Sequence, residues 1–253
     1  MKVLIVHPTR GRIQPFRDSA LNILQGCDSH DEITYMLSFD EDDTFFRKNL
    51  DWVRNSVKKS NTSFFYCIAK NSGIIQATNR LYNRKILENT DIAVIHSDDM
   101  RFPPSWVTHI LGKLQNVGFD KLLKVRHPGE PDENTRELLT LQIGGSQAFL
   151  DYGAFFCPEY TSVYGDNDLT EWAKKNRRFC WALELPPFPH LHPGFKLPED
   201  VVRLYGTVPY DQTYSRENSQ AAYTIGEKVF AARSALGFPP VSFTGASDEI
   251  RRL

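Results

Sequence analysis

Residues 91–100, Asp-Ile-Ala-Val-Ile-His-Ser-Asp-Asp-Met, contain a short apolar run that ends directly in polar side chains. Ile92–Ile95 is apolar without alternation, which is typical of a strand buried on both faces of a parallel sheet. Val3–Val6 has the same character and stops before Pro8. Further runs at Ile33–Phe39 and Phe64–Ile68 predict two more strands.

Helical patterns separate these strands. Apolar residues recur at helical spacing in residues 16–24, 52–57 and 73–87, so strand and helix alternate. This alternation predicts an α/β fold with a mostly parallel sheet and helices on both faces. In the second half we expect short strands within 147–156, a helix within 163–176 and a last helix near 218–236. We assign 1–195 to a core and 196–253 to an irregular C-terminal extension packed on it.

Composition narrows the class of protein. Thirty basic and thirty-one acidic side chains among 253 residues give a net charge of −1, so the whole chain has no general attraction to nucleic acid or anionic membranes. The four cysteines form no C-x-x-C pair, which argues against a zinc ribbon or a disulfide framework. No stretch approaches the roughly 20 apolar residues of a membrane span. We therefore expect a cytoplasmic protein.

Three polar clusters follow the predicted strands: Thr9-Arg10-Gly11-Arg12, Asp40–Asp43 and Ser97-Asp98-Asp99. Ligands of open α/β sheets bind beyond the carboxyl ends of the strands, so these clusters are expected to meet at one edge. Asp98 and Asp99 offer oxygen ligands for Mn²⁺ or Mg²⁺, although an acidic solvated turn has the same composition. Asp40 could accept hydrogen bonds from a nucleobase or a ribose, or belong to a charged turn.

The loop after the first strand lacks both the Walker pattern and G-x-G-x-x-G, which argues against a Walker ATPase and a Rossmann dehydrogenase. Thr9, Arg10 and Arg12 could still hold a nucleotide phosphate.

Two further clusters come later in the chain. Asp168 and Glu171 have the spacing of a capping box, which predicts a structural Asp168 and places Asp166 just outside a helix. Asp166 is then free to act as a general base toward an acceptor hydroxyl. His190 and His192 flank Leu191, and either imidazole could face a metal; a surface or hydrogen-bonded role is the ordinary alternative for each.

Together these clusters resemble the inverting GT-A glycosyltransferases of family 2. Asn71-x-Gly73-x-x-x-Ala77-x-Asn79 matches that family's N-x-G-x-x-x-A-x-N segment, and residues 95–99 resemble its D-x-D-D metal motif. Gly165–Leu169 resembles the motif that supplies its catalytic base. The resemblance covers residues 1 to about 195.

The resemblance implies a GT-A, Rossmann-like fold and metal-dependent transfer of a sugar from a nucleotide sugar, most simply a UDP-sugar, to an acceptor hydroxyl. Asp166 would be the base in a single inverting displacement. The implied donor contacts are Thr9, Arg10, Arg12, Asp40, Asn71, Gly73, Asn79, Ser97 and Asp98. The implied metal ligands are Asp98, Asp99 and His190 or His192.

One residue departs from the family's pattern. His96 stands where D-x-D has its first acid, which leaves Asp98 as the clearest metal ligand. The exchange could provide a nitrogen ligand, weaken metal binding or move a donor contact onto Ser97.

Other functions fit the same residues. The acceptor could be a glycan, a small molecule or a hydroxymethylated DNA base, since some phage glycosyltransferases with a similar Ser-Asp-Asp-Met stretch modify such bases. A DNA groove would need basic residues such as Lys58-Lys59, Lys121, Lys124–Arg126 and Lys174–Arg178. A nucleotidyltransferase, or a binding module without catalysis, would share the sheet.

Overall fold

One mixed sheet forms the centre of the molecule. The computed structural model describes residues 1–56, 61–70, 73–243 and 250–252. In these parts of the chain eight strands pair in the order β7-β5-β6-β4-β1-β2-β3-β8. Their bounds are β1 Lys2–Pro8, β2 Glu32–Asp40, β3 Thr62–Ala69, β4 Ile92–Ile95, β5 Leu122–Lys124, β6 Gln142–Gly145, β7 Phe179–Trp181 and β8 Arg251–Arg252.

The four strands of the first half of the chain pair in parallel, as do β5 and β7 in the second half. β1 pairs in parallel with β2 and β4, and β2 pairs in parallel with β3. β6 joins β4 in antiparallel orientation, as β8 joins β3 at the far edge. The mostly parallel α/β sheet predicted from the alternating pattern is confirmed.

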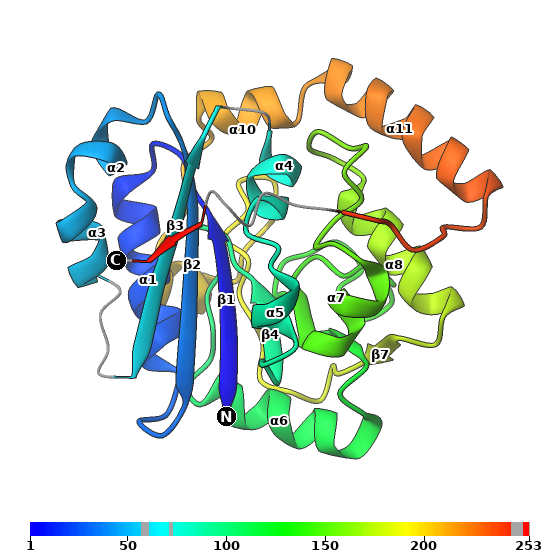
Figure 1. Ribbon diagram of the computed structural model, residues 1–253, viewed down its shortest axis with the longest axis horizontal. Helices are drawn as coiled ribbons and strands as arrows, with labels where there is room; N and C mark the ends of the chain where they lie inside the picture. The colour runs from blue at the N-terminus through cyan, green and yellow to red at the C-terminus, as the bar shows by residue number, and fades with distance from the viewer. Residues whose placement is uncertain (57–60, 71–72, 244–249, 253) are drawn as a thin grey trace.

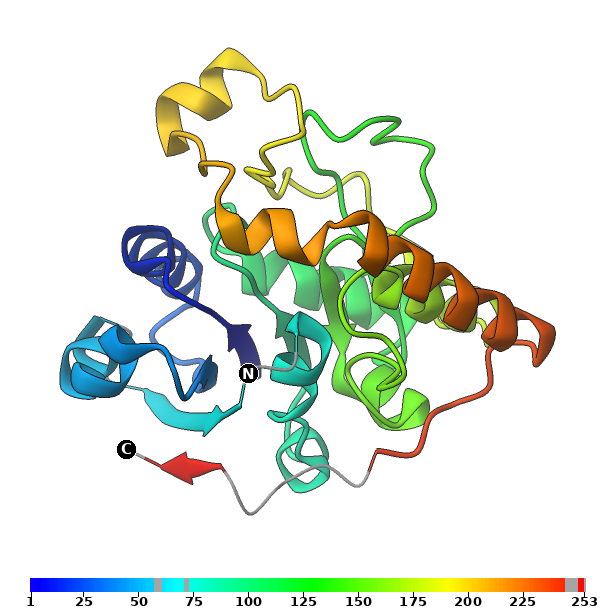
Figure 2. The same cartoon turned by 90° about the horizontal axis from the view of Figure 1, so that it is seen from above.

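Alternate side chains of β1 point into two separate hydrophobic clusters, which explains why this strand is apolar at successive positions. Val3 and Ile5 pack with the side chains of α1 (Ile13–Gln25), α2 (Thr44–Lys48), α3 (Leu50–Ser56) and α6 (Trp106–Val117). Leu4 and Val6 pack on the other face, against α4 (Ile74–Asn79), α5 (Arg84–Leu87), α7 (Ser146–Tyr152) and α8 (Gly165–Lys175). Helices therefore cover both faces (Figures 1 and 2).

The C-terminal part returns to the core at several points. It contains α9 (Glu199–Tyr205), α10 (Gln212–Glu217) and α11 (Gln220–Ala235), and α11 lies against α8 (Figure 2). At the end of the described chain β8 lies beside β3 (Figure 1). In the described residues no helix has the length and apolarity needed to span a membrane.

Two local predictions were wrong. Residues 146–152 form the helix α7 in place of strands, because the buried Ala148, Phe149 and Tyr152 follow helical spacing. The single helix expected over 73–87 is two short ones, α4 and α5. The break lies after Asn79. The side-chain N–H of Asn79 donates to the carbonyl of Phe156 at 2.9 Å, and its side-chain oxygen accepts from the N–H of Phe156 at 3.0 Å.

Candidate active site

The carboxyl ends of β1, β2 and β4 place their following residues along one edge of the sheet. The backbone N–H of Thr9 donates to Ser38 in β2 at 2.9 Å, and that of His96 donates to Val6 in β1 at 2.7 Å. These bonds hold the three strand ends in register around a cavity of about 670 Å³. The sequence-predicted residues that line it are Thr9, Arg10, Arg12, Asp40, Gly73, Ser97, Asp98, Asp99, Asp166, His190 and His192.

A short pairing of two loops brings His190 to Asp99. Met100 and His190 form an isolated antiparallel bridge, and the N–H of Leu191 donates to the carbonyl of Asp99 at 2.7 Å. As a result His190 Nε2 lies 3.3 Å from Asp99 Oδ2, and Ser97 Oγ donates to Asp99 Oδ1 at 2.5 Å. Burial alone would raise the pKa of Asp99, but His190 and the hydrogen bonds from His190 and Ser97 hold it well below its usual value.

Asp98 faces a different set of partners from Asp99. Its Oδ1 lies 2.9 Å from His7 Nε2, and Thr9 Oγ1 donates to both carboxylate oxygens, at 3.1 and 3.0 Å. The residue is 5% exposed and borders the cavity. Its predicted roles as metal ligand and donor contact stay predictions, and the structure adds a firm internal anchor for its carboxylate.

His96 lies in the wall of the cavity, on its interior side. Its side chain is fully buried and packs edge-on against His7 and Phe102, with ring centroids 4.4 and 5.2 Å apart. Burial, reinforced by His7, lowers the pKa of His96 well below 6.5, so the imidazole is neutral. His96 therefore belongs to the packing beneath the acidic turn.

His192 is engaged by the C-terminal part of the chain. Its Nδ1 accepts from the N–H of Gly194 at 3.1 Å, and Nε2 is in hydrogen-bond contact with the hydroxyl of Tyr214 in α10. Burial and the neighbouring His190 lower the pKa of His192 to about 4. Of the two histidines proposed from sequence, His190 is the one beside an aspartate of the acidic turn.

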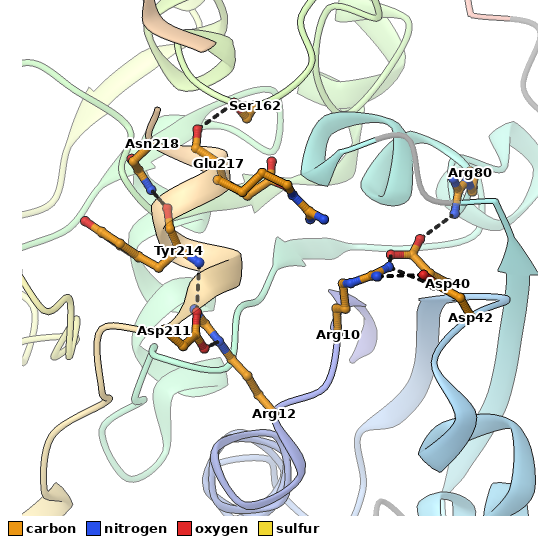
Figure 3. Close-up of polar contacts among 11 residues, drawn as sticks. Arg10, Arg12, Asp40, Asp42, Arg80, Ser162, Asp211, Tyr214, Glu217 and Asn218 are labelled. Atoms are coloured by element: carbon orange, nitrogen blue, oxygen red, sulfur yellow. Dashed lines mark hydrogen bonds and ion pairs between the residues drawn. The ribbon is translucent and has the colours of Figure 1, made fainter. Parts of the chain in front are cut away.

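Two arginines of the loop after β1 extend in different directions (Figure 3). Arg10 binds Asp40 and forms a bidentate pair with Asp42 at 2.9 and 2.8 Å. Arg12 forms a bidentate pair with Asp211, with nitrogen–oxygen distances of 2.6 and 2.9 Å. Both guanidinium groups border the cavity, where an anionic ligand could compete for them.

Asp166 lies in the first turn of α8, where sequence analysis had placed it just before the helix. Its carboxylate Oδ1 accepts from the N–H of Asn167 at 2.9 Å, and both residues line the cavity. Burial raises the pKa of Asp166 above its usual value, against a lowering by that hydrogen bond and by the charge of Arg136. A carboxyl poised in this way fits proton transfer, because its conjugate base is stronger than that of an ordinary aspartate.

Asp168 has the structural role expected, but by another mechanism. The helix begins at Gly165 after Tyr164, so the capping box with Glu171 does not form. Asp168 is instead fully buried, and its carboxylate accepts from the hydroxyls of Tyr152 and Tyr160 and from both Nε and Nη2 of Arg233 in α11. Arg233 lies 65 residues away from Asp168 in the sequence, so local spacing could not predict this ion pair.

Residues 73–79, the described part of the N-x-G-x-x-x-A-x-N motif, contribute to the wall of the cavity. Gly73 has φ +87°, and a Cβ there would come within 2.3 Å of the Thr161 carbonyl oxygen, so glycine is required. Asn79 is fully buried and absent from the cavity lining among the described residues, which gives it a structural role in place of the predicted donor contact. Asn71 lies outside the described residues.

The basic residues proposed for a DNA groove are mostly neutralised. Lys124 is fully buried and pairs with Glu130 at 2.8 Å, so it cannot contact DNA. Lys121 and Arg178 both pair with Asp120, and Lys174 pairs with two glutamates. Lys58 and Lys59 lie outside the described residues.

The cavity has further lining residues, of which the sequence suggests only Tyr214 and Arg216, as members of a stretch that could border an acceptor or pack over the sheet. The C-terminal segment contributes a group of lining side chains, Tyr214, Arg216, Glu217, Asn218 and Tyr223, and the loop before β6 contributes Glu130 and Arg136. Ser162 Oγ donates to the Glu217 carbonyl at 2.8 Å and so ties α10 to the loop before α8 (Figure 3). The sequence feature that pointed to this part of the cavity was the density of tyrosine and arginine in 205–216, and that density does not show where in the fold these side chains lie.

Comparison of the whole chain with solved structures identifies the fold. The S. aureus TarS fragment 1–349 superposes with a TM-score of 0.55 at 14% identity, covering 75% of this chain and 60% of that one. Mannosyltransferase PcManGT from Pyrobaculum calidifontis gives a TM-score of 0.51 at 13% identity, over 92% of this chain and 75% of that one. Glucosyl-3-phosphoglycerate synthase from Mycobacterium tuberculosis gives a TM-score of 0.50 at 12% identity, over 95% of this chain and 81% of that one.

These neighbours are nucleotide-diphospho-sugar transferases of one architecture. The chain has the GT-A fold. It spans 60% of the length of the TarS fragment. No protein-family model matches the sequence. No curated protein matches it either. In the GT-A framework the cavity described above lies at the carboxyl ends of the parallel strands, the position where open α/β sheets bind ligands.

Proposed function

We propose that this protein is a metal-dependent, inverting glycosyltransferase that moves a sugar from a nucleotide-sugar donor to an acceptor hydroxyl. The observation that carries the proposal is the single cavity that joins the Asp99–His190 pair to Asp166. A carboxylate and an imidazole beside the strand ends suit the diphosphate side of a donor. A carboxyl with a raised pKa on the same cavity suits the acceptor side.

The donor is proposed to lie over the ends of β1, β2 and β4. Asp40 would accept from the nucleobase, and Arg12 and Thr9 would contact the diphosphate, with Ser97 and Asp98 beside the ribose and sugar. Structures of the GT-A neighbours TarS with UDP-GlcNAc and the M. tuberculosis synthase with UDP support a UDP-sugar. PcManGT was solved with GDP-Man, so a guanine nucleotide is the other donor to test.

The residues present fit a divalent ion. Among the described residues no group of three or more His, Cys, Asp or Glu side chains is placed to hold a metal by itself. Mg²⁺ usually binds one or two protein carboxylates plus substrate phosphates and water, so Asp99 with His190, completed by the diphosphate, is sufficient. Asp98 is the further candidate ligand. When bound, the ion would neutralise charge on the departing diphosphate.

The acceptor would be activated by Asp166. Its carboxylate takes the proton of the acceptor hydroxyl, and the hydroxyl oxygen forms the new bond to the anomeric carbon as the bond from that carbon to the diphosphate oxygen breaks. Attack from the face opposite the diphosphate inverts the anomeric configuration. The segment 196–253, which we propose as an extension packed on a core of 1–195, would border the acceptor through Tyr214 and Tyr223.

The experiment is a thermal-shift screen of UDP-, GDP-, CMP- and dTDP-sugars with and without Mn²⁺. A ligand that binds the folded state at a hundred times its Kd stabilises it by about 2.7 kcal/mol, so the true donor raises the melting temperature. We expect a shift with one nucleotide and a larger shift when Mn²⁺ is present. If no nucleotide sugar changes the melting temperature in either condition, the proposal is wrong. Slow hydrolysis of the bound donor would separate a transferase from a binding module.

A further inference from the structure

Asp98 stands at the end of a buried chain of hydrogen bonds that begins inside the sheet. Tyr35 in β2 places its hydroxyl 2.5 Å from His7 Nδ1, and His7 Nε2 lies 2.9 Å from Asp98 Oδ1. Tyr35 and His7 are both fully buried, whereas Asp98 borders the cavity. A polar connection therefore runs from the interior of the sheet to the cavity wall.

The partners of His7 decide which ring nitrogen carries the proton. An ionised carboxylate only accepts hydrogen bonds, so Nε2–H of His7 must donate to Asp98. The hydroxyl of Tyr35 stays protonated in this buried position, and its hydrogen needs an acceptor, which a bare Nδ1 of His7 provides. These contacts favour the tautomer of His7 that carries its proton on Nε2.

This tautomer fixes how Asp98 presents its oxygens. Oδ1 receives hydrogen bonds from His7 and from Thr9. Among the described residues, Oδ2 receives only the second contact of the same Thr9 hydroxyl, at 3.0 Å. Two donors from two directions hold the plane of the carboxylate. Oδ2 keeps lone-pair capacity for a ligand of the cavity that Asp98 borders.

Packing alone does not require these two polar residues. His7 lies among Phe16, Tyr35 and His96, with ring centroids 5.1, 5.9 and 4.4 Å away. An aliphatic side chain at this position in β1 would fill the same kind of space, as Leu4 and Ile5 do, without a buried imidazole to satisfy. What His7 and Tyr35 provide beyond packing is a chain of hydrogen bonds that ends on the carboxylate of Asp98.

We propose that His7 and Tyr35 are positioning residues that orient Asp98 toward the nucleotide-sugar donor. The inference rests on the proposed function, because Asp98 meets a donor only if the cavity binds a nucleotide sugar. Groups that orient a ligating side chain in this way change metal affinity or activity by about tenfold to a hundredfold when they are removed.

The first test measures the tautomer without any ligand. Nitrogen-15 NMR of histidine-labelled protein should show His7 with a protonated Nε2 and a bare Nδ1. Tyr35→Phe removes the hydroxyl that contacts Nδ1, so the Nδ1 signal should shift, whereas Nε2 should stay protonated by its contact with Asp98. A wild-type His7 with Nδ1 protonated would overturn the inference.

The second test measures the affinity for UDP and for GDP, each with Mn²⁺, by calorimetry. We expect His7→Leu to weaken binding of the nucleotide that the wild type binds by about tenfold to a hundredfold. His7→Gln should recover much of this loss, because its amide N–H can still donate to Asp98. Tyr35→Phe should weaken binding less than His7→Leu and covers the case in which His7→Leu does not fold.

The matched control is Tyr66→Phe, in which a buried tyrosine of β3 that stacks on Phe39 loses its hydroxyl. It should leave the affinity unchanged. Equal affinity in the wild type, His7→Leu and Tyr35→Phe would overturn the inference and leave the proposed function standing. A wild type that binds neither nucleotide, with the His7 tautomer as described, would instead overturn the proposed function.

Discussion

The ion pair between Asp168 and Arg233 offers a sharp test of how the C-terminal helix supports the site. Asp168 is fully buried, and the Arg233 side chain is 5% exposed, so neither charge is well solvated. Their bonds measure 2.8 and 3.0 Å. Replacing Arg233 by Met keeps much of the side-chain volume but, in the part of the chain that the structure describes, leaves the carboxylate with two tyrosine hydroxyls as its donors.

Breaking a buried pair by removing one partner costs about 3–5 kcal/mol, because an uncompensated charge stays buried. At roughly 2–4 °C per kcal/mol for a chain of this size, Arg233→Met should lower the melting temperature by about 6–20 °C. Adding Asp168→Asn removes the orphaned charge and should restore a large part of the loss. Circular dichroism melts and urea titrations of the two variants measure both effects.

The matched control is Arg84→Met, which breaks the exposed pair with Glu88 at 2.9 Å. An exposed pair of this i,i+4 type contributes about 0.3–0.5 kcal/mol, so its loss should barely move the transition. A change for Arg233→Met as small as that of the control would refute the reasoning. So would a double variant that is less stable than Arg233→Met.

Three further predictions concern the cavity. Asp166→Asn should abolish transfer while donor binding persists, and it should stabilise the fold at neutral pH, because burial raises the pKa of this carboxyl and makes its ionisation costly in the folded state. For the same reason kcat should rise with pH through a pKa above the usual 3.8, and a flat profile across that range would contradict the base assignment. Asp99→Asn or His190→Ala should remove the extra thermal shift that Mn²⁺ adds to the donor; calorimetry in which Mn²⁺ still strengthens donor binding would argue against this pair as ligands. Asp211→Asn should tighten donor binding several-fold, roughly 1 kcal/mol, since the diphosphate no longer competes with a carboxylate for Arg12 while the helix cap is retained; unchanged or weaker affinity would place the diphosphate elsewhere.

Periodicity determined much of the fold in advance. The uninterrupted apolar runs at β1 and β4 could only be satisfied by burial on both faces, and β1 does contact a separate cluster on each face. Regular patterns failed where tertiary contacts compete with them. The predicted helix over 73–87 breaks because the side-chain amide of Asn79 forms hydrogen bonds with the backbone of Phe156, which lies 77 residues away in the sequence.

For the site, the sequence by itself determined which residues follow the ends of the parallel strands, because that placement depends only on strand order and direction. Thr9, Asp40 and Asp98 reach one cavity for this reason. Only the tertiary structure decided how the members of each cluster divide their roles. Asp99 meets His190 through a bridge between loops 90 residues apart. Asp98 meets His7 of β1, which in turn contacts Tyr35 of β2. Such pairings depend on orientation in three dimensions, which residue type and spacing do not contain.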